Sequence, residues 1–139
     1  MKKISIITVI LLSCFSALWA QESEKRNAFI IFDNVYLPIE LENNAIADTL
    51  IKRMPFTTEI NNYNDEIFYM ETDLRTNESQ TTTIEKGLLF YHPATQRIMF
   101  AHKEFSVPID ILLIGKVTEN GLRKIEKISS NVSEVTLEQ

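Results

Sequence analysis

The sequence is short of the residues that many catalytic and metal sites need. It has one cysteine, Cys14, so no disulfide can form within the chain. It has only three glycines, none of them in a G-x-x-x-x-G-K phosphate loop or a G-x-S-x-G nucleophile elbow. Its two histidines, His92 and His102, have no third ligand at a spacing typical of zinc sites. The sequence therefore predicts neither a metal nor another cofactor.

Positive charge is also scarce. The formal net charge is -5, and removal of residues 1–20, which contain Lys2 and Lys3, takes it to -7. The basic residues cluster only at Arg123, Lys124 and Lys127, a pattern common on a solvated short helix. Because affinity for nucleic acid rests on clustered Lys and Arg, we expect no nucleic-acid partner.

Long apolar runs are missing, with one exception at the N-terminus. Lys2 and Lys3 precede the apolar run Ile4–Leu12, and small and mixed residues follow up to Ala20. This pattern is typical of an export signal, and the run is shorter than the roughly 20 apolar residues of a membrane span. We therefore expect an exported protein, periplasmic or secreted, with no transmembrane span in the mature chain.

Two cleavage sites compete for this signal. Cleavage after Ala20 gives a signal peptide of residues 1–20, and it is the alternative that we favour. The other possibility is a lipoprotein signal at Leu11-Leu12-Ser13-Cys14, with the mature chain anchored through an acylated Cys14. Residues 21–27 are polar and are interpreted as a flexible leader, followed by one domain at 28–139.

Strand signals dominate this domain. Ala28–Phe32 and Val35–Leu41 are β-prone and flank the turn formers Asp33 and Asn34, which predicts a hairpin. Further strands are predicted at Phe56–Ile60, Ile67–Met70, Ile111–Ile114 and Glu134–Glu138, and surface loops at Asn61–Asp65, Arg75–Thr83 and Lys103–Pro108. The loop at 75–83 is also a possible rim for a ligand.

One helix is expected between the first hairpin and the Phe56 strand. Asn43 or Asn44 can cap it, and Pro55 ends it. The apolar residues at helical spacing are Ala47, Leu50, Ile51 and Met54. One helix among many short strands favours a mainly β (α+β) fold, namely a small closed or partly closed β-barrel with one main helix.

The stretch Gly87–His102 predicts the central hairpin. If His92 pairs with Arg97 and Leu89 with Phe100, both faces of the hairpin are apolar in their middles. We interpret it as a core hairpin whose tip can also line a groove. The candidate groove residues are Tyr91, His92, Arg97, Phe100 and His102. In this register the two histidines lie on opposite faces, so they do not share a metal.

Acidic residues do not add a second candidate site. Asp65, Glu66, Glu71 and Asp73 lack the glycine and the closing glutamate of a calcium loop. A solvated acidic face is the expected arrangement, because such charges normally lie exposed.

Several short segments together resemble the bacterial cyclophilin-like family of small barrels, over about Ala28–Glu138. These segments are Asn44-Ala45-Ile46-Ala47, Met54-Pro55-Phe56-Thr57, Glu85-Lys86-Gly87, Tyr91-His92-Pro93, Ile98-Met99-Phe100, Gly115-Lys116-Val117 and the closing V-T-L-E. The resemblance implies a cyclophilin-like barrel.

The chain also departs from this pattern. Leu88 stands where such proteins commonly carry aspartate. True cyclophilins use an arginine near a segment of the F-x-x-Q-x-G type to hydrogen-bond the prolyl nitrogen, and no such segment is present in this sequence. None of Arg53, Arg75, Arg97 and Arg123 can therefore be assigned as a catalytic arginine, and isomerase activity does not follow from the fold.

Three functions remain open at this point. The first is a non-catalytic exported module that binds a small molecule or an extended peptide beside the central hairpin. The second is a peptidyl-prolyl cis/trans isomerase, for which Arg97 is the first residue to mutate. The third is a structural or interaction protein of the cell envelope, tethered through Cys14 or through a sheet edge near Pro38. The sequence leaves the oligomeric state open.

Overall fold

The structure is a computed structural model that describes residues 26–139. The predicted signal peptide and both of its cleavage sites lie outside the described residues. In chain order the elements are β1 (Arg26–Phe32), β2 (Val35–Leu41), α2 (Ala45–Arg53), β3 (Phe56–Glu59), β4 (Asn61–Tyr63), β5 (Ile67–Glu71), β6 (Gln80–Ile84), β7 (Leu88–His92), β8 (Arg97–Ala101), β9 (Phe105–Val117), α3 (Glu119–Leu122), η1 (Ile125–Lys127) and β10 (Glu134–Glu138). The predicted class, mostly β with one main helix, is confirmed. Within 26–139 no helix is long and apolar enough to cross a membrane.

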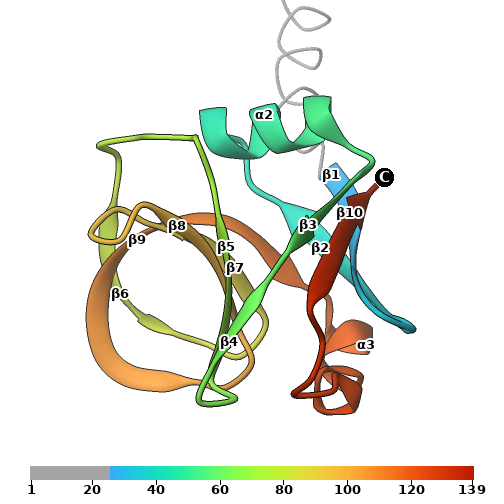
Figure 1. The fold of residues 1–139 in the computed structure, drawn as a ribbon. Coiled ribbons are helices and arrows are strands. Elements are labelled where there is room, and N and C mark those ends of the chain that lie inside the picture. Colours follow the sequence, from blue (N-terminus) through green and yellow to red (C-terminus); the bar gives the residue numbers. More distant parts are fainter. Residues whose placement is uncertain (1–25) are drawn as a thin grey trace, which may run out of the picture.

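The strands form one antiparallel sheet that curls around the core (Figure 1). Its order is β3-β10-β1-β2-β9-β7-β8-β5-β4, with β6 paired to the first half of β9. The two end strands, β3 and β4, are consecutive in the chain and are separated only by Ile60. The segment 56–63 therefore pairs with β10 through its first half and with β5 through its second.

The closed form of the predicted barrel is not found. No ladder pairs β3 with β5 within residues 26–139, so the hydrogen-bonded path ends at β3 on one side and at β4 on the other. In Figure 1, β3 and β5 lie close near β4 and diverge toward α2. The sheet is therefore open beside α2.

The register predicted for the central hairpin is confirmed. β7 and β8 pair Leu89 with Phe100 and His92 with Arg97. Their two faces enter two separate hydrophobic clusters. Leu89, Tyr91, Ile98 and Phe100 belong to the main core, and Leu88, Phe90 and Ala101 belong to a smaller cluster with Ile84 and Ile111. The hairpin is therefore buried on both sides.

Helix α2 forms as predicted and lies over one end of the sheet (Figure 1). Asn44 caps it by accepting a hydrogen bond from the Ala47 amide at 3.0 Å. Its buried stripe of Ile46, Ala47 and Leu50 packs on the core, which leaves Lys52 and Arg53 in the last turn at the surface. The start of the helix is further held by an ion pair between Arg26 of β1 and Asp48.

Three predicted loops are partly strands. Asn61–Tyr63 is β4, because Asn64 and Asp65 adopt positive φ angles of 53° and 57° and turn the chain back onto β5. Gln80–Ile84 is β6, and Phe105–Pro108 belongs to the long strand β9. Each of these pairs with a partner strand, and that tertiary pairing overrides a polar local sequence.

The remaining boundaries differ only slightly from the predictions. β1 begins at Arg26, so two residues assigned to the leader belong to the first strand. The short helix indicated by Arg123, Lys124 and Lys127 is split into α3 and the short 3-10 helix η1. The last strand is confirmed, with Val135 and Leu137 buried.

Candidate functional site

A cleft of about 310 Å³ lies where the sheet is open. We call it the α2 cleft. It is bounded by the last turns of α2, by β3, by the end of β5 and by the segment that follows β5. The lining residues are Leu50, Arg53, Phe56, Thr57, Thr58, Met70, Glu71, Thr72, Asp73 and Ile98. This volume falls at the lower end of the range for small-molecule sites.

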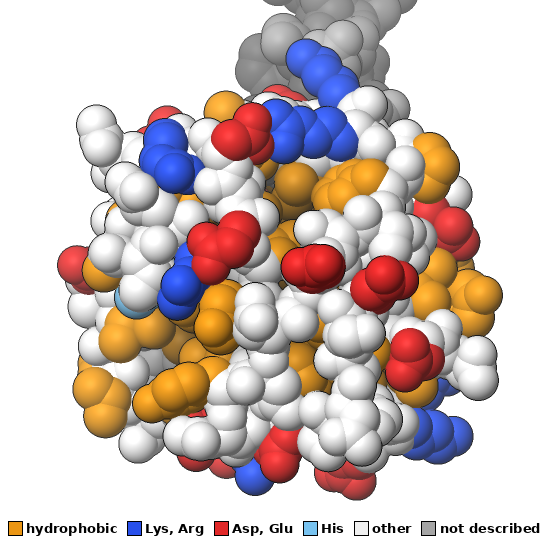
Figure 2. All heavy atoms as spheres, viewed as in Figure 1, with side chains coloured by type: hydrophobic (Ala, Val, Ile, Leu, Met, Phe, Trp, Pro, Cys, Tyr) orange, Lys and Arg blue, Asp and Glu red, His pale blue; other side chains and the backbone are white. Residues whose placement is uncertain are grey.

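The floor of the α2 cleft is part of the main hydrophobic core. Leu50, Met70 and Ile98 are only 3%, 4% and 1% exposed, and Phe56 is half-buried against the same core. On the face that carries β3 to β5, hydrophobic side chains are visible in a hollow among charged and polar ones (Figure 2). A ligand in this hollow would contact the core directly.

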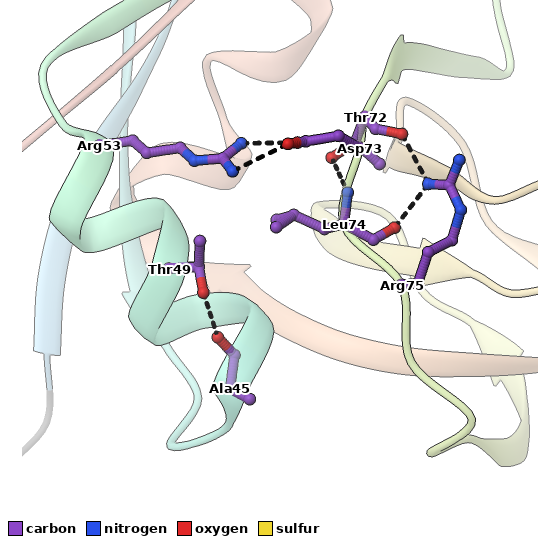
Figure 3. Close-up of polar contacts among 7 residues, drawn as sticks. All are labelled: Ala45, Thr49, Arg53, Thr72, Asp73, Leu74 and Arg75. Atoms are coloured by element: carbon purple, nitrogen blue, oxygen red, sulfur yellow. Dashed lines mark hydrogen bonds and ion pairs between the residues drawn. The ribbon is translucent and has the colours of Figure 1, made fainter.

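The rim carries an arginine that points across the cleft. Arg53, at the end of α2, donates from Nη1 and Nη2 to the two carboxylate oxygens of Asp73 at 2.8 and 3.2 Å (Figure 3). These hydrogen bonds lower the pKa of Asp73. Both side chains are exposed, at 45% and 75%, so water screens the pair and it adds little to stability.

The segment after β5 is held by its own hydrogen bonds. The Thr72 hydroxyl accepts from the Leu74 amide, and Arg75 folds back to donate to the carbonyl oxygens of Thr72 and Leu74 at 2.7 Å (Figure 3). Leu74 is half-buried against the main core. Asp73 is therefore presented to Arg53 by a short anchored turn.

Two of the residues predicted for a groove lie in the core. Tyr91 and Phe100 are 1% and 2% exposed, and the Phe100 ring packs 5.2 Å from that of Phe32. Neither lines a described cavity. The structure therefore gives both aromatic residues a packing role.

His92 and Arg97 lie together at the tip of the hairpin. The Nδ1 atom of His92 is 2.7 Å from the Thr95 hydroxyl. Partial burial lowers the pKa of His92, against an opposing effect of the Asp110 carboxylate. Arg97 donates to Glu71 at 2.8 Å and its guanidinium lies 4.5 Å from the centre of the Tyr69 ring. Because Glu71 also lines the α2 cleft, Arg97 borders that cleft from outside.

His102 lies apart from the other predicted residues. Its ring nitrogens are 2.9 and 3.1 Å from the carbonyl oxygens of Asp65 and Ile125, and its ring meets Phe68 edge-on. It borders a separate open hollow with Lys86 and Glu126. These contacts hold the β4–β5 turn against η1, which is a structural role. In residues 26–139 no group of three or more His, Cys, Asp or Glu side chains is placed to hold a metal ion.

Another cavity, of about 230 Å³, lies between β6 and the β7–β9 pair. Threonines and charged residues surround a small apolar floor there, formed by Leu88, Ile111 and Leu113. It is smaller than the α2 cleft, and the one cation in its lining, Lys116, pairs with Glu85. Its apolar floor is an internal control for binding at the α2 cleft.

The α2 cleft was not predicted from the sequence. Arg53 and Asp73 are 20 residues apart, and only the packing of α2 beside the end of β5 brings them together. A weak signal existed in Arg53 directly before Met54-Pro55-Phe56, where a helix ends beside a strand that begins with an apolar residue.

Comparison with known proteins agrees with this geometry at the level of the fold. The profile of a family described as the cyclophilin-like family matches residues 30–138. The chain belongs to the cyclophilin-like family. This confirms the resemblance drawn from the sequence. No curated protein sequence matches this chain.

Two solved structures share the cyclophilin-like fold of this chain. McbB, solved in complex with tryptophan, superposes with a TM-score of 0.61 at 12% identity, over 81% of this chain and 44% of McbB. The hypothetical protein AF2241 from Archaeoglobus fulgidus superposes with a TM-score of 0.59 at 20% identity, over 82% of this chain and 94% of that protein. The chain thus spans less than half of McbB. At these identities the likeness concerns the fold alone.

Proposed function

We propose that this cyclophilin-like chain is a non-catalytic binding module whose ligand occupies the α2 cleft. One observation carries the proposal: within residues 26–139 the sheet lacks a strand pairing beside α2, and core side chains line a cleft there under a charged rim. Clefts that combine an apolar floor with a few polar groups on the rim are the usual form of small-ligand sites.

The tryptophan bound by McbB supplies the first probe. Tryptophan combines an aromatic ring, which matches the floor of Leu50, Met70 and Ile98, with a carboxylate, which matches Arg53. The match is one of chemistry, because the two proteins share only their fold.

The test is to map binding on the protein by methyl NMR. Tryptophan and a tetrapeptide that ends in phenylalanine are titrated into the full mature chain. We expect the methyl signals of Leu50, Met70 and Ile98 to shift, while those of Leu88, Ile111 and Leu113 stay in place. Shifts confined to the second group, or no shifts with either probe, would overturn the proposal.

Peptidyl-prolyl isomerase activity is the alternative that the family suggests. Arg97, the arginine chosen for mutation from the sequence, is occupied by Glu71 and by the Tyr69 ring, which leaves it poorly placed to polarise a prolyl bond. We expect a protease-coupled proline-peptide assay to give the uncatalysed rate. A faster rate that falls in Arg97→Gln would replace the binding proposal with the isomerase one.

We also propose that the protein is exported, with its mature chain starting at Gln21. The support is the sequence pattern at residues 1–20. Mass spectrometry of the mature N-terminus tests this directly. A chain that begins at an acylated Cys14 would instead establish a lipoprotein, and a chain that retains Lys2 would exclude export.

A further inference from the structure

One edge of β3 carries backbone groups that no strand within residues 26–139 uses. The amide of Ile60 donates to the carbonyl of Ser133 at 2.9 Å, and the register of β3 with β10 continues from that pair. In an antiparallel ladder every second residue pair exchanges hydrogen bonds. Thr58 and Phe56 therefore bond to β10, while the N–H and C=O groups of Thr57 point away from β10, toward the α2 cleft.

A side-chain contact agrees with this assignment. Thr57 and its partner Thr136 form a hydroxyl–hydroxyl hydrogen bond of 2.7 Å. Such short cross-strand contacts are typical of pairs that exchange no backbone bonds, because their side chains lie closer. Thr57 thus offers one backbone donor and one acceptor to an incoming chain.

The direction of β3 decides which end of a chain would fit. Every ladder in this sheet is antiparallel. An added strand that runs antiparallel to β3 ends beside the first residue of β3, Phe56, where α2 finishes. Arg53 lies three residues before Phe56 and lines the same cleft. An antiparallel chain would bring a C-terminal carboxylate to this guanidinium, whereas a parallel chain would bring a positive amino group.

Arg53 retains the capacity to bind a second carboxylate. Its hydrogen bonds to Asp73 use Nη1 and Nη2, and its Nε has no hydrogen-bond partner within the described part of the chain. The ion pair with Asp73 is exposed and screened by water, so a ligand carboxylate can share Arg53 with Asp73 or displace Asp73 from it. Arginine suits this role because its planar group binds carboxylates in a bidentate manner.

We propose that the α2 cleft binds the C-terminal end of an extended peptide whose last residue is apolar. The last residue lies opposite Phe56, so its side chain is on the core-facing side of β3, over Leu50, Met70 and Ile98, and its carboxylate lies on Arg53. The residue before it lies opposite Thr57 and pairs with the Thr57 backbone as part of an added strand. This mode combines strand addition with capture of a terminal carboxylate. It rests on the proposed function and names the ligand class of that site.

The first arm of the test varies the ligand against the wild-type protein. A fluorescein-labelled Ser-Thr-Ala-Phe peptide is titrated by fluorescence polarisation, beside the same peptide with a C-terminal amide and one that ends in aspartate. We expect both changes to weaken binding at least tenfold. Methylation of the nitrogen of the next-to-last residue should also weaken it, because that residue lies opposite Thr57 and its N–H pairs with the β3 edge. Equal affinity for the acid and the amide would overturn the proposal.

The second arm varies the protein. Arg53→Gln should weaken binding of the free-acid peptide at least tenfold and leave binding of the amide unchanged. Lys52→Gln removes the same charge from the same turn of α2 without altering the lining, so it should bind as the wild type does. Asp73→Asn should bind two- to fivefold more tightly, since it removes the competing carboxylate. Weaker binding by Asp73→Asn would contradict the role given to Arg53.

The third arm tests the strand edge with a matched pair. Thr57→Val and Thr57→Pro both lose the hydroxyl contact with Thr136, but only Thr57→Pro loses the amide that faces the cleft. Because both variants lack the hydroxyl, they are compared with each other: we expect Thr57→Pro to bind at least fivefold more weakly than Thr57→Val, and equal binding by the two would contradict pairing at this edge. If Thr57→Pro does not fold, the N-methyl peptide makes the same comparison from the ligand side.

The outcomes separate this inference from the proposed function. If free phenylalanine binds as tightly as the peptide, the cleft is an amino-acid site, so the function holds and the peptide inference fails. If only neutral apolar compounds shift the methyl groups of the cleft, the carboxylate inference fails in the same way. If no probe shifts those methyl groups, both proposals fall.

Discussion

The central hairpin and the α2 cleft use similar residues in opposite ways. In the hairpin, β7 lies between β8 and β9, and β8 lies between β7 and β5, so every strand edge is paired and both faces are buried. Beside α2, β3 pairs with β10 alone among the strands of residues 26–139, and the apolar residues next to it form the floor of an open cleft. The same hydrophobic core thus packs under fully paired strands at the hairpin and under an open cleft beside α2.

This difference shows where function can reside in so small a fold. Tyr91 and Phe100 were candidates for ligand contact in the sequence, but both side chains are buried in the core of the structure. Arg53 and Asp73 look like ordinary surface charges, but they stand over an opening in the sheet. Incomplete strand pairing distinguishes the two regions better than residue type does.

The largest expected effect lies in the hairpin. Phe100→Ala removes a ring that is 2% exposed and packs against Phe32, and it should lower the free energy of unfolding by about 3–5 kcal/mol. Urea denaturation measures the change. Phe29→Ala, at a phenylalanine that is 41% exposed, is the control and should cost less than about 1 kcal/mol. A similar loss of unfolding free energy in both variants would mean that the buried hairpin contributes no more to stability than an exposed position does.

Hydrogen exchange compares the two regions at the level of the backbone. The Thr57 amide faces the open cleft and should exchange quickly, while the Tyr91 amide should exchange only when the hairpin opens. We expect a difference in protection of at least about a hundredfold, since exchange in a core strand needs a large opening. The Thr58 amide, bonded to β10, is the control within the same strand. Protection of Thr57 equal to that of Thr58 would remove the free edge on which the peptide proposal rests.

The entry to the hairpin gives a smaller effect. Gly87 has a φ of 89°, and a Cβ there would lie 2.7 Å from a methyl carbon of Leu122. Gly87→Ala should therefore lower the free energy of unfolding by about 1–3 kcal/mol, as judged by urea denaturation. The converse control is Gln96→Gly in the turn between β7 and β8, where a φ of 55° already favours glycine. A loss of stability in Gln96→Gly comparable to that in Gly87→Ala would contradict this account.

The hairpin could be predicted from its sequence because its information is local. Apolar residues at both odd and even positions indicate that both faces of the hairpin are buried, and the short loop from Pro93 to Gln96 fixes the register of its two strands. Helix α2 could be predicted equally well, since Asn44 caps it and Pro55 ends it. These features depend on neighbours in the chain, so a single sequence contains them.

The open edge could not be predicted because it depends on partners distant in sequence. β4 and β6 consist largely of polar residues that form strands only by pairing with β5 and β9. The cleft arises because β3 pairs with β10, some 75 residues later, and not with β5. No local pattern records a missing pair, so Arg53 and Asp73 gain their significance only in the folded chain.

The smallest expected effect concerns pH. Burial lowers the pKa of His92 in the folded state, so the unfolded chain binds more protons between that lowered value and the ordinary histidine pKa of about 6.5. The contribution of His92 to stability is therefore complete above about pH 6.5 and is lost as the pH falls through this window. Free energies of unfolding at pH 7.5 and pH 5 should show a small decrease that His92→Gln reduces.

The same measurement compares the hairpin tip with the α2 cleft. The pKa of Asp73 is also lowered, by the hydrogen bonds from Arg53, but its titration lies below the ordinary value of 3.8, outside this pH range. Asp73→Asn should therefore leave the pH 7.5 to pH 5 difference unchanged. A decrease that survives in His92→Gln and disappears in Asp73→Asn would assign the pH response to the α2 cleft. It would also show that the Arg53–Asp73 pair contributes more to stability than stated above.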